Sequence, residues 1–88
     1  MRSIRADSTE WLTVTLTADH DITGDDVEMS LDGGATWHTA EHVTGGVRLL
    51  VGPGAALPLT TGVRTVYVRI HDMPEIPVLS AGALTVVA

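Results

Sequence analysis

Apolar and polar residues alternate along much of this chain, with the period of a β-strand that buries one face. Between residues 11 and 18 the even positions are apolar, and the odd positions carry Trp11 and three threonines. The same alternation recurs at residues 27–31 and 64–71, and no window shows the 3.6-residue apolar period of a helix. The positions expected to face the core are Leu12, Val14, Leu16, Val27, Met29, Leu31, Val66, Val68 and Ile70.

Turn residues divide the chain into short strands. Glycine pairs and prolines separate the alternating segments, and the two prolines between residues 74 and 77 predict an irregular or edge segment. Further strands are expected at residues 3–6, 36–38, 47–51 and 83–87. About six or seven strands with a turn every 8–12 residues or so predict one all-β domain over residues 1–88. An immunoglobulin-like antiparallel β-sandwich is favoured over a small barrel.

One octapeptide carries a recognisable hairpin motif, S-x-D-x-G-x-T-W. It resembles the Asp-box of sialidases and many unrelated β-proteins, where the motif is mostly architectural. The Asp32 carboxylate is therefore interpreted as accepting N–H groups of the turn, and not as a catalytic group. The residues of this structural hairpin are Ser30, Asp32, Gly34, Thr36 and Trp37.

Charge and composition exclude several classes of function. The net charge of −6 argues against binding to nucleic acids or anionic membranes, which need a basic surface. No apolar run approaches the about 18 residues of a membrane span, and the first residues hold no apolar signal core. The chain has no cysteine, so it can form neither disulfides nor thiolate metal sites. We expect a soluble, acidic protein.

Two groups of side chains could bind a metal ion. An acidic loop over residues 19–26 (Asp19, His20, Asp21, Asp25 and Asp26) could hold calcium, but it lacks the spacing of an EF-hand. His38 and His42 would lie about 13 Å apart on a strand, too far for one zinc ion, although His20 or His71 could join a larger set. Solvated surface groups are favoured in both cases, so no metal or cofactor is predicted.

The sequence lacks the residues of a recognisable catalytic site. There is no G-x-S-x-G nucleophile elbow, and the glycine-rich segments lack the lysine and helix of a phosphate-binding loop. A glycosidase needs two carboxylates in a cleft, for which so small a sandwich has little room. We therefore expect a protein that is not an enzyme.

Two segments resemble immunoglobulin-like modules of bacteria and phages. Residues 27–37 are similar to their V-x-x-S-x-D-G-G-x-T-W hairpin, and residues 59–72 to their L-x-x-G-x-Y-x-V-x-V-R-x-x-D strand. Arg64 occupies the position of the tyrosine corner. Residues 67–82 also resemble the ending V-R-x-x-D-x-P-E-x-P-x-x-x-A-G of small virion proteins from phages of actinobacteria.

This resemblance implies a structural virion component, either a capsid decoration protein or part of the head–tail connector. Its expected partners are capsid, portal, neck or tail subunits, in multiple copies per particle, and its location is the virion and, before assembly, the host cytoplasm. Candidate partner contacts are Trp11, Met73, Pro74, Ile76 and Pro77. Trp11 could instead fold over the edge of the sandwich. The alternative function is a carbohydrate- or surface-binding module that stacks sugars on Trp11, Trp37 or Tyr67.

Overall fold

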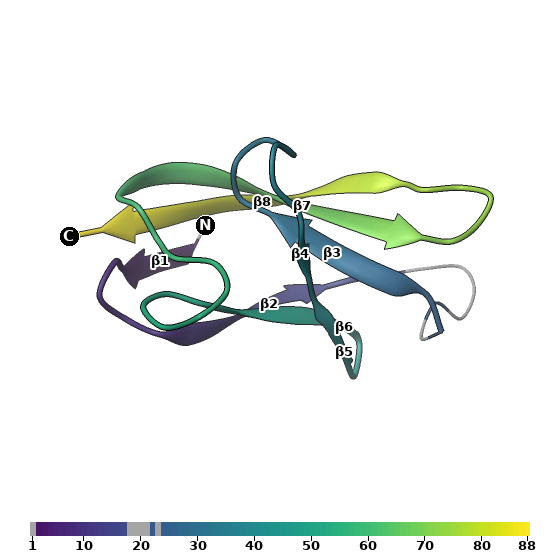
Figure 1. The fold of residues 1–88 in the computed structure, drawn as a ribbon, viewed down its shortest axis with the longest axis horizontal. Coiled ribbons are helices and arrows are strands. Elements are labelled where there is room, and N and C mark those ends of the chain that lie inside the picture. The colour runs from purple at the N-terminus through teal and green to yellow at the C-terminus, as the bar shows by residue number, and fades with distance from the viewer. Residues whose placement is uncertain (1, 18–21, 23) are drawn as a thin grey trace.

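The computed structural model describes residues 2–17, 22 and 24–88, and these form two β-sheets with no helix. The five-stranded sheet has the order β1-β8-β7-β3-β4, and the three-stranded sheet has the order β2-β6-β5 (Figure 1). None of the described segments is a helix long and apolar enough to cross a membrane. The strands are β1 (Arg2–Arg5), β2 (Glu10–Thr15), β3 (Asp26–Ser30), β4 (His38–Thr39), β5 (Glu41–Val43), β6 (Gly46–Val51), β7 (Gly62–His71) and β8 (Val78–Val87).

This arrangement is an immunoglobulin-like sandwich. Strands β2, β6 and β5 take the places of strands B, E and D of that fold, and β3, β7 and β8 take those of C, F and G. The predicted all-β sandwich without a disulfide is therefore confirmed. Every pair of neighbouring strands is antiparallel except β1 and β8, which run parallel from Arg2↔Leu84 to Arg5↔Val87.

The core lies between the two sheets and follows the predicted alternation. The inward positions of β3 and β7 are buried as expected, and so is Leu12 of β2, whereas Val14 and Leu16 are only partly buried. A branched or linear aliphatic side chain occupies nearly every core position, which suits the pleated surface of a sheet. The core residues are Ile4, Leu12, Val27, Met29, Leu31, Ala40, Val47, Leu49, Val51, Val66, Val68, Ile70, Leu84 and Val86.

The structure corrects three strand predictions. Eight described strands replace the expected six or seven, because β5 was not predicted. Strand β8 begins at Val78, five residues before the expected start at Ala83, and β2 ends at Thr15. Residues 80–82 are Ser, Ala and Gly, which have weak strand propensity, and the pairing with β7 decides the conformation of this part of β8.

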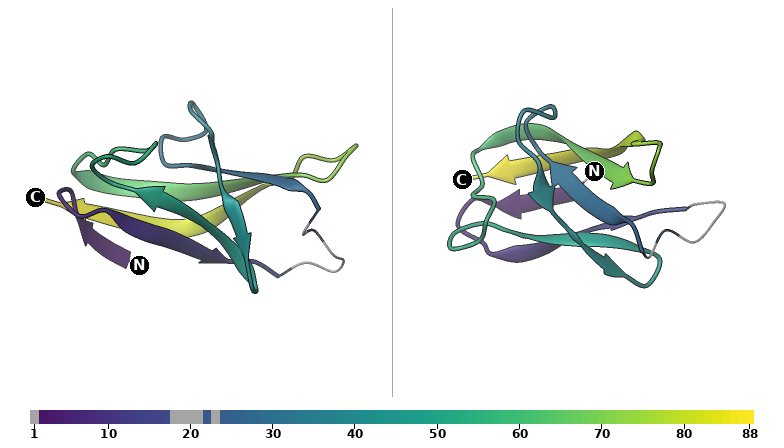
Figure 2. Two further views of the ribbon diagram at one scale, coloured as in Figure 1. Left: turned by 60° about the horizontal axis from the view of Figure 1, so that its bottom comes forward. Right: turned by 45° about the vertical axis from the view of Figure 1, so that its right-hand side comes forward.

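The β7–β8 hairpin is longer than the sheet that packs against it. Each of its strands has ten residues, whereas β2 and β6 have six. At about 3.3 Å per residue the hairpin therefore extends well beyond the three-stranded sheet. Its tip lies at the opposite end of the molecule from the C-terminus (Figure 1 and Figure 2).

Candidate functional site

The turn between β3 and β4 is held together by the side chains of the Asp-box motif. The Ser30 hydroxyl donates to Asp32 Oδ1 at 2.7 Å and accepts the Gly34 N–H at 3.0 Å. Asp32 Oδ1 also accepts the Thr36 N–H at 2.9 Å. Ser30 is fully buried, so its hydroxyl serves this turn and is not exposed as a nucleophile. The motif thus closes the turn by the hydrogen bonding expected for Asp32.

These hydrogen bonds stabilise the ionised form of Asp32. The Ser30 hydroxyl, followed by the backbone and hydroxyl groups of Thr36, lowers the pKa of the Asp32 carboxyl from 3.8 to about 2. A depressed pKa in the folded state stabilises the fold above the ordinary pKa, and this contribution is lost as the pH falls through the folded-state value. The turn should therefore weaken between pH 3.8 and about 2.

Asp32→Asn tests this dependence. The amide keeps the shape but not the charge, so the variant should be less stable at pH 7 and lose less stability on acidification from about pH 4 to 2. Thermal unfolding measured across this range gives the comparison. Glu75→Gln, an exposed carboxylate of the β7–β8 turn, is the control and should keep the wild-type acid slope. An unchanged slope in Asp32→Asn would contradict the assignment.

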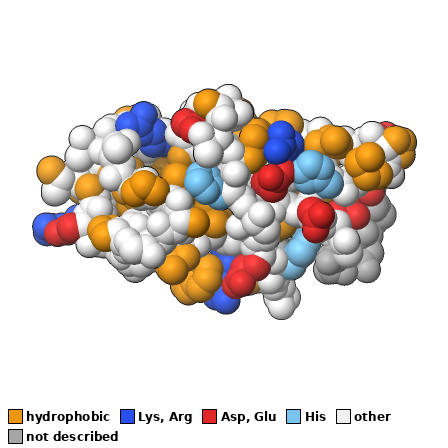
Figure 3. Space-filling view, in the orientation of Figure 1, with side chains coloured by type: hydrophobic (Ala, Val, Ile, Leu, Met, Phe, Trp, Pro, Cys, Tyr) orange, Lys and Arg blue, Asp and Glu red, His pale blue; other side chains and the backbone are white. Residues whose placement is uncertain are grey.

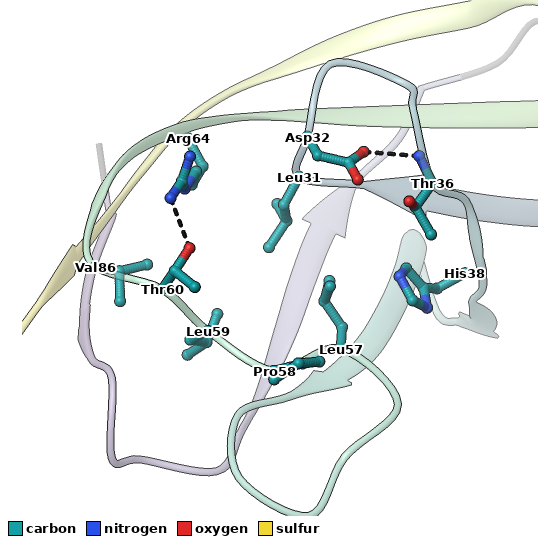
Figure 4. Close-up of a pocket in the computed structure, with 10 residues that line it drawn as sticks. All are labelled: Leu31, Asp32, Thr36, His38, Leu57, Pro58, Leu59, Thr60, Arg64 and Val86. Carbon is teal, nitrogen blue, oxygen red and sulfur yellow. Dashed lines mark hydrogen bonds between the residues drawn. The ribbon is translucent and has the colours of Figure 1, made fainter.

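A small pocket of about 200 Å³ lies beside this turn. Figure 4 shows Asp32, Thr36 and His38 on one side of it and Arg64 on the other. Its remaining lining residues are Leu31, Leu57, Pro58, Leu59, Thr60 and Val86. The pocket is smaller than the about 300–1,000 Å³ of typical ligand sites.

The two charged groups of the pocket, Asp32 and Arg64, already have protein partners. Asp32 is held by the turn, and Arg64 Nη2 donates to Thr60 Oγ1 at 2.6 Å and to the Thr61 carbonyl at 3.3 Å. Arg64 therefore ties the start of β7 to the chain just before it, as the hydroxyl of a tyrosine corner does. These contacts give Asp32 and Arg64 structural roles at this end of the sandwich.

A charged ladder crosses the outer face of the five-stranded sheet. Glu28 of β3 accepts hydrogen bonds from Arg69 of β7 at 2.8 and 3.1 Å and lies 2.5 Å from His71 Nε2. His71, followed by Arg69, lowers the pKa of the Glu28 carboxyl, against the opposing effect of burial. The Arg69 guanidinium also lies over the ring of Trp37, 4.3 Å from its centroid. The ladder thus joins the Asp-box turn to the middle of the sheet.

Trp11 lies on the outer face of the three-stranded sheet and not over its edge. It alternates with buried Leu12 and remains 42% exposed. The Arg48 guanidinium is 3.9 Å from the centre of its ring, and Arg48 also forms an ion pair with Glu41. Tyr67 lies in β7 of the other sheet, and Trp37 lies just before β4 against Arg69 of β7. The three aromatic residues therefore form no common surface for stacking a sugar.

The tip of the β7–β8 hairpin exposes apolar side chains, because the shorter three-stranded sheet does not cover it. Met73 is 73% exposed and Val78 is 52% exposed, and Ile76 and Leu79 are also exposed. Pro74 is exposed as well, and Pro77 is half-buried. The candidate contacts between residues 73 and 77 therefore lie together at this tip, far from the pocket, and Trp11 lies on the other sheet. Hydrophobic side chains gather at this end of the molecule in Figure 3.

One exposed residue of this tip, Leu79, was not predicted as a contact from the sequence, whereas Val78 ended the apolar segment expected to make one. Val78 and Leu79 lie in β8, opposite Arg69 and Val68 of β7. The alternation of β7 indicates that Leu79 faces inward beside Val68, yet it is exposed because the three-stranded sheet does not reach it. The sequence carries no sign of this, since exposure there depends on the length of the opposite sheet.

The candidate metal ligands are not brought together in the described structure. His38 lies in β4 of one sheet and His42 in β5 of the other, because the chain crosses between the sheets at Ala40. His42 Nε2 contacts the Asp25 carbonyl at 2.7 Å. Asp19, His20 and Asp21 lie outside the described residues. Among residues 2–17, 22 and 24–88, no group of three or more histidine or acidic side chains could hold a metal ion.

Comparison with known protein families, with curated sequences and with solved structures finds no match to this chain. Its function must therefore be argued from its own residues.

Proposed function

We propose that the chain is a non-enzymatic structural module of a phage particle, which docks on capsid, portal, neck or tail subunits in multiple copies. The observation that carries the proposal is the apolar tip of the β7–β8 hairpin. Exposed apolar groups gathered on one surface are typical of protein interaction sites. The tip is also formed by the segment, residues 67–82, whose sequence resembles small virion proteins.

The build of the tip suits docking. Met73, Ile76 and Leu79 present apolar surface, and the prolines at 74 and 77 restrict the backbone between them. A segment that is already restricted loses little conformational entropy when it binds. Binding to a larger assembly would in turn stabilise this small domain by mass action.

The proposal predicts that the chain is bound to particles. In a lysate of the phage that encodes it, the chain should sediment with virions banded on a density gradient. Ile76→Glu should lower the particle-bound fraction at least about tenfold, because it places a charge in the apolar contact. Val63→Glu is the matched control and should bind as wild type, since Val63 is equally apolar and 67% exposed at the other end of β7.

A chain that stays free in the lysate, absent from purified virions, would contradict the proposal. Equal loss of binding in both variants would place the contact elsewhere on the surface.

A further inference from the structure

One side of the sandwich is open. Strand β2 is the outermost strand of its sheet, and its only described neighbour is β6. The first half of β8 is also an edge, because β1 pairs only with residues 84–87. Between these two edges lies a groove of about 480 Å³, lined by Leu12, Val14 and Val66 and by the small residues 81–83.

Strand β2 has few of the features that normally protect an edge strand, since its one charged residue is Glu10 at its start. Natural edges are blocked by charged side chains, prolines or bulges, since an unpaired edge is a template for another strand. Residues 11–16 contain neither a charge nor a proline, and β2 pairs with β6 without a break from Glu10↔Val51 to Thr15↔Gly46. The β8 edge differs, because Ala81 and Gly82 both lie opposite Val66 and form a bulge.

The β2 sequence is complementary to itself in one antiparallel register. With a twofold axis at Thr13, that residue meets the same threonine of a second copy on the outer face. Leu12 then meets Val14 on the inner face, and Trp11 meets Thr15 on the outer face. Threonine pairs and aromatic–β-branched pairs are among the favourable cross-strand pairs. A register shifted by one residue would instead oppose inward and outward side chains.

We propose that β2 pairs with β2 of a second copy of this chain, which joins the two three-stranded sheets into a six-stranded sheet. The resulting order is β5-β6-β2-β2-β6-β5, and the partner copy covers the open groove. A second copy is favoured over a strand of another protein because residues 11–15 match on both faces at once, and Glu10 falls opposite Leu16 so that no two charges meet. The contact uses a different strand from the hairpin tip. The proposed dimer can therefore be tested independently of the proposed docking to a virion.

Charge reversal at Thr13 tests the pairing. Thr13 is exposed on the outer face, so a charged side chain leaves the monomer core untouched. On the twofold axis, however, the two copies of this side chain meet. Thr13→Glu alone and Thr13→Lys alone should each raise the dimer dissociation constant at least about 100-fold, because like charges then lie opposite each other. An equimolar mixture of the two variants should restore the dimer.

Sedimentation equilibrium from about 1 µM to 1 mM covers the affinities expected of such a contact. Thr65→Glu, an exposed threonine of the interior strand β7, is the control and should dimerise as wild type. Melting curves of all variants check that each is folded. The proposal is overturned if the wild type is monomeric throughout this range, if either single variant dimerises normally, or if the mixture stays monomeric. A monomer alone would leave the open edge to a strand of another protein.

Discussion

Leu84→Ala is expected to lower the free energy of unfolding by about 2–5 kcal/mol. Leu84 is 0% exposed and lies in β8, which pairs with β1 on one side and β7 on the other. Removing its side chain leaves a cavity, since pairing on both sides limits how far β8 can move inward. The melting temperature should fall by at least about 10 °C. Thermal and urea denaturation followed by circular dichroism measure both quantities.

Leu79→Ala is the matched control on the same strand. Leu79 is 41% exposed and lies beyond the three-stranded sheet, so the same truncation should cost less than about 1 kcal/mol. Equal losses in the two variants would show that the first half of β8 is covered, which would also contradict the exposed hairpin tip. The difference between the variants therefore tests the fold and the proposed docking surface together.

Gly52→Ala is expected to destabilise the protein by about 3–5 kcal/mol. A Cβ atom at this position would lie 2.0 Å from the Ser8 carbonyl oxygen, which belongs to backbone and cannot rotate away. Gly52 also has a φ of +109°, which L side chains rarely adopt. Its N–H donates to the Leu57 carbonyl at 2.9 Å, so the loop cannot relax without losing that bond.

Two other glycines separate the clash from the backbone strain. Gly54 has a φ of +80° but nothing near its Cβ position, so Gly54→Ala should cost only about 1–2 kcal/mol. Gly24 has neither feature, and Gly24→Ala should be neutral or stabilise slightly by restricting the unfolded chain. Urea denaturation should rank the three variants in this order. A Gly52→Ala variant as stable as Gly54→Ala would contradict the close approach between Gly52 and the Ser8 carbonyl.

The core could be predicted from the sequence because side chains of a strand alternate regardless of which strands pair. Val27, Met29 and Val68 are buried for this reason, and the same rule placed Trp11 outside. Strand β5 could not be predicted in this way, since its three residues are too few to show a period. The crossing between the sheets at Ala40 could not be predicted for the same reason. This crossing places His38 and His42 on different sheets.

The candidate sites were predictable only in part. The contacts of the Asp-box turn follow from residues within seven positions of one another, and so they can be inferred locally. The pocket combines Leu31, Leu57 and Val86, which only the packing of distant segments brings together. The ladder of Glu28 and Arg69 likewise depends on the register between β3 and β7.

By itself the sequence determined the two-sided strands, the inward residues and the turn at Ser30–Trp37, because alternation and turn geometry are local properties. Only the tertiary structure decided which surfaces remain uncovered. The β7–β8 tip is exposed because the opposite sheet is shorter, and the β2 edge is open because β1 pairs with β8. Both depend on pairing between segments far apart in the chain, which local patterns do not encode.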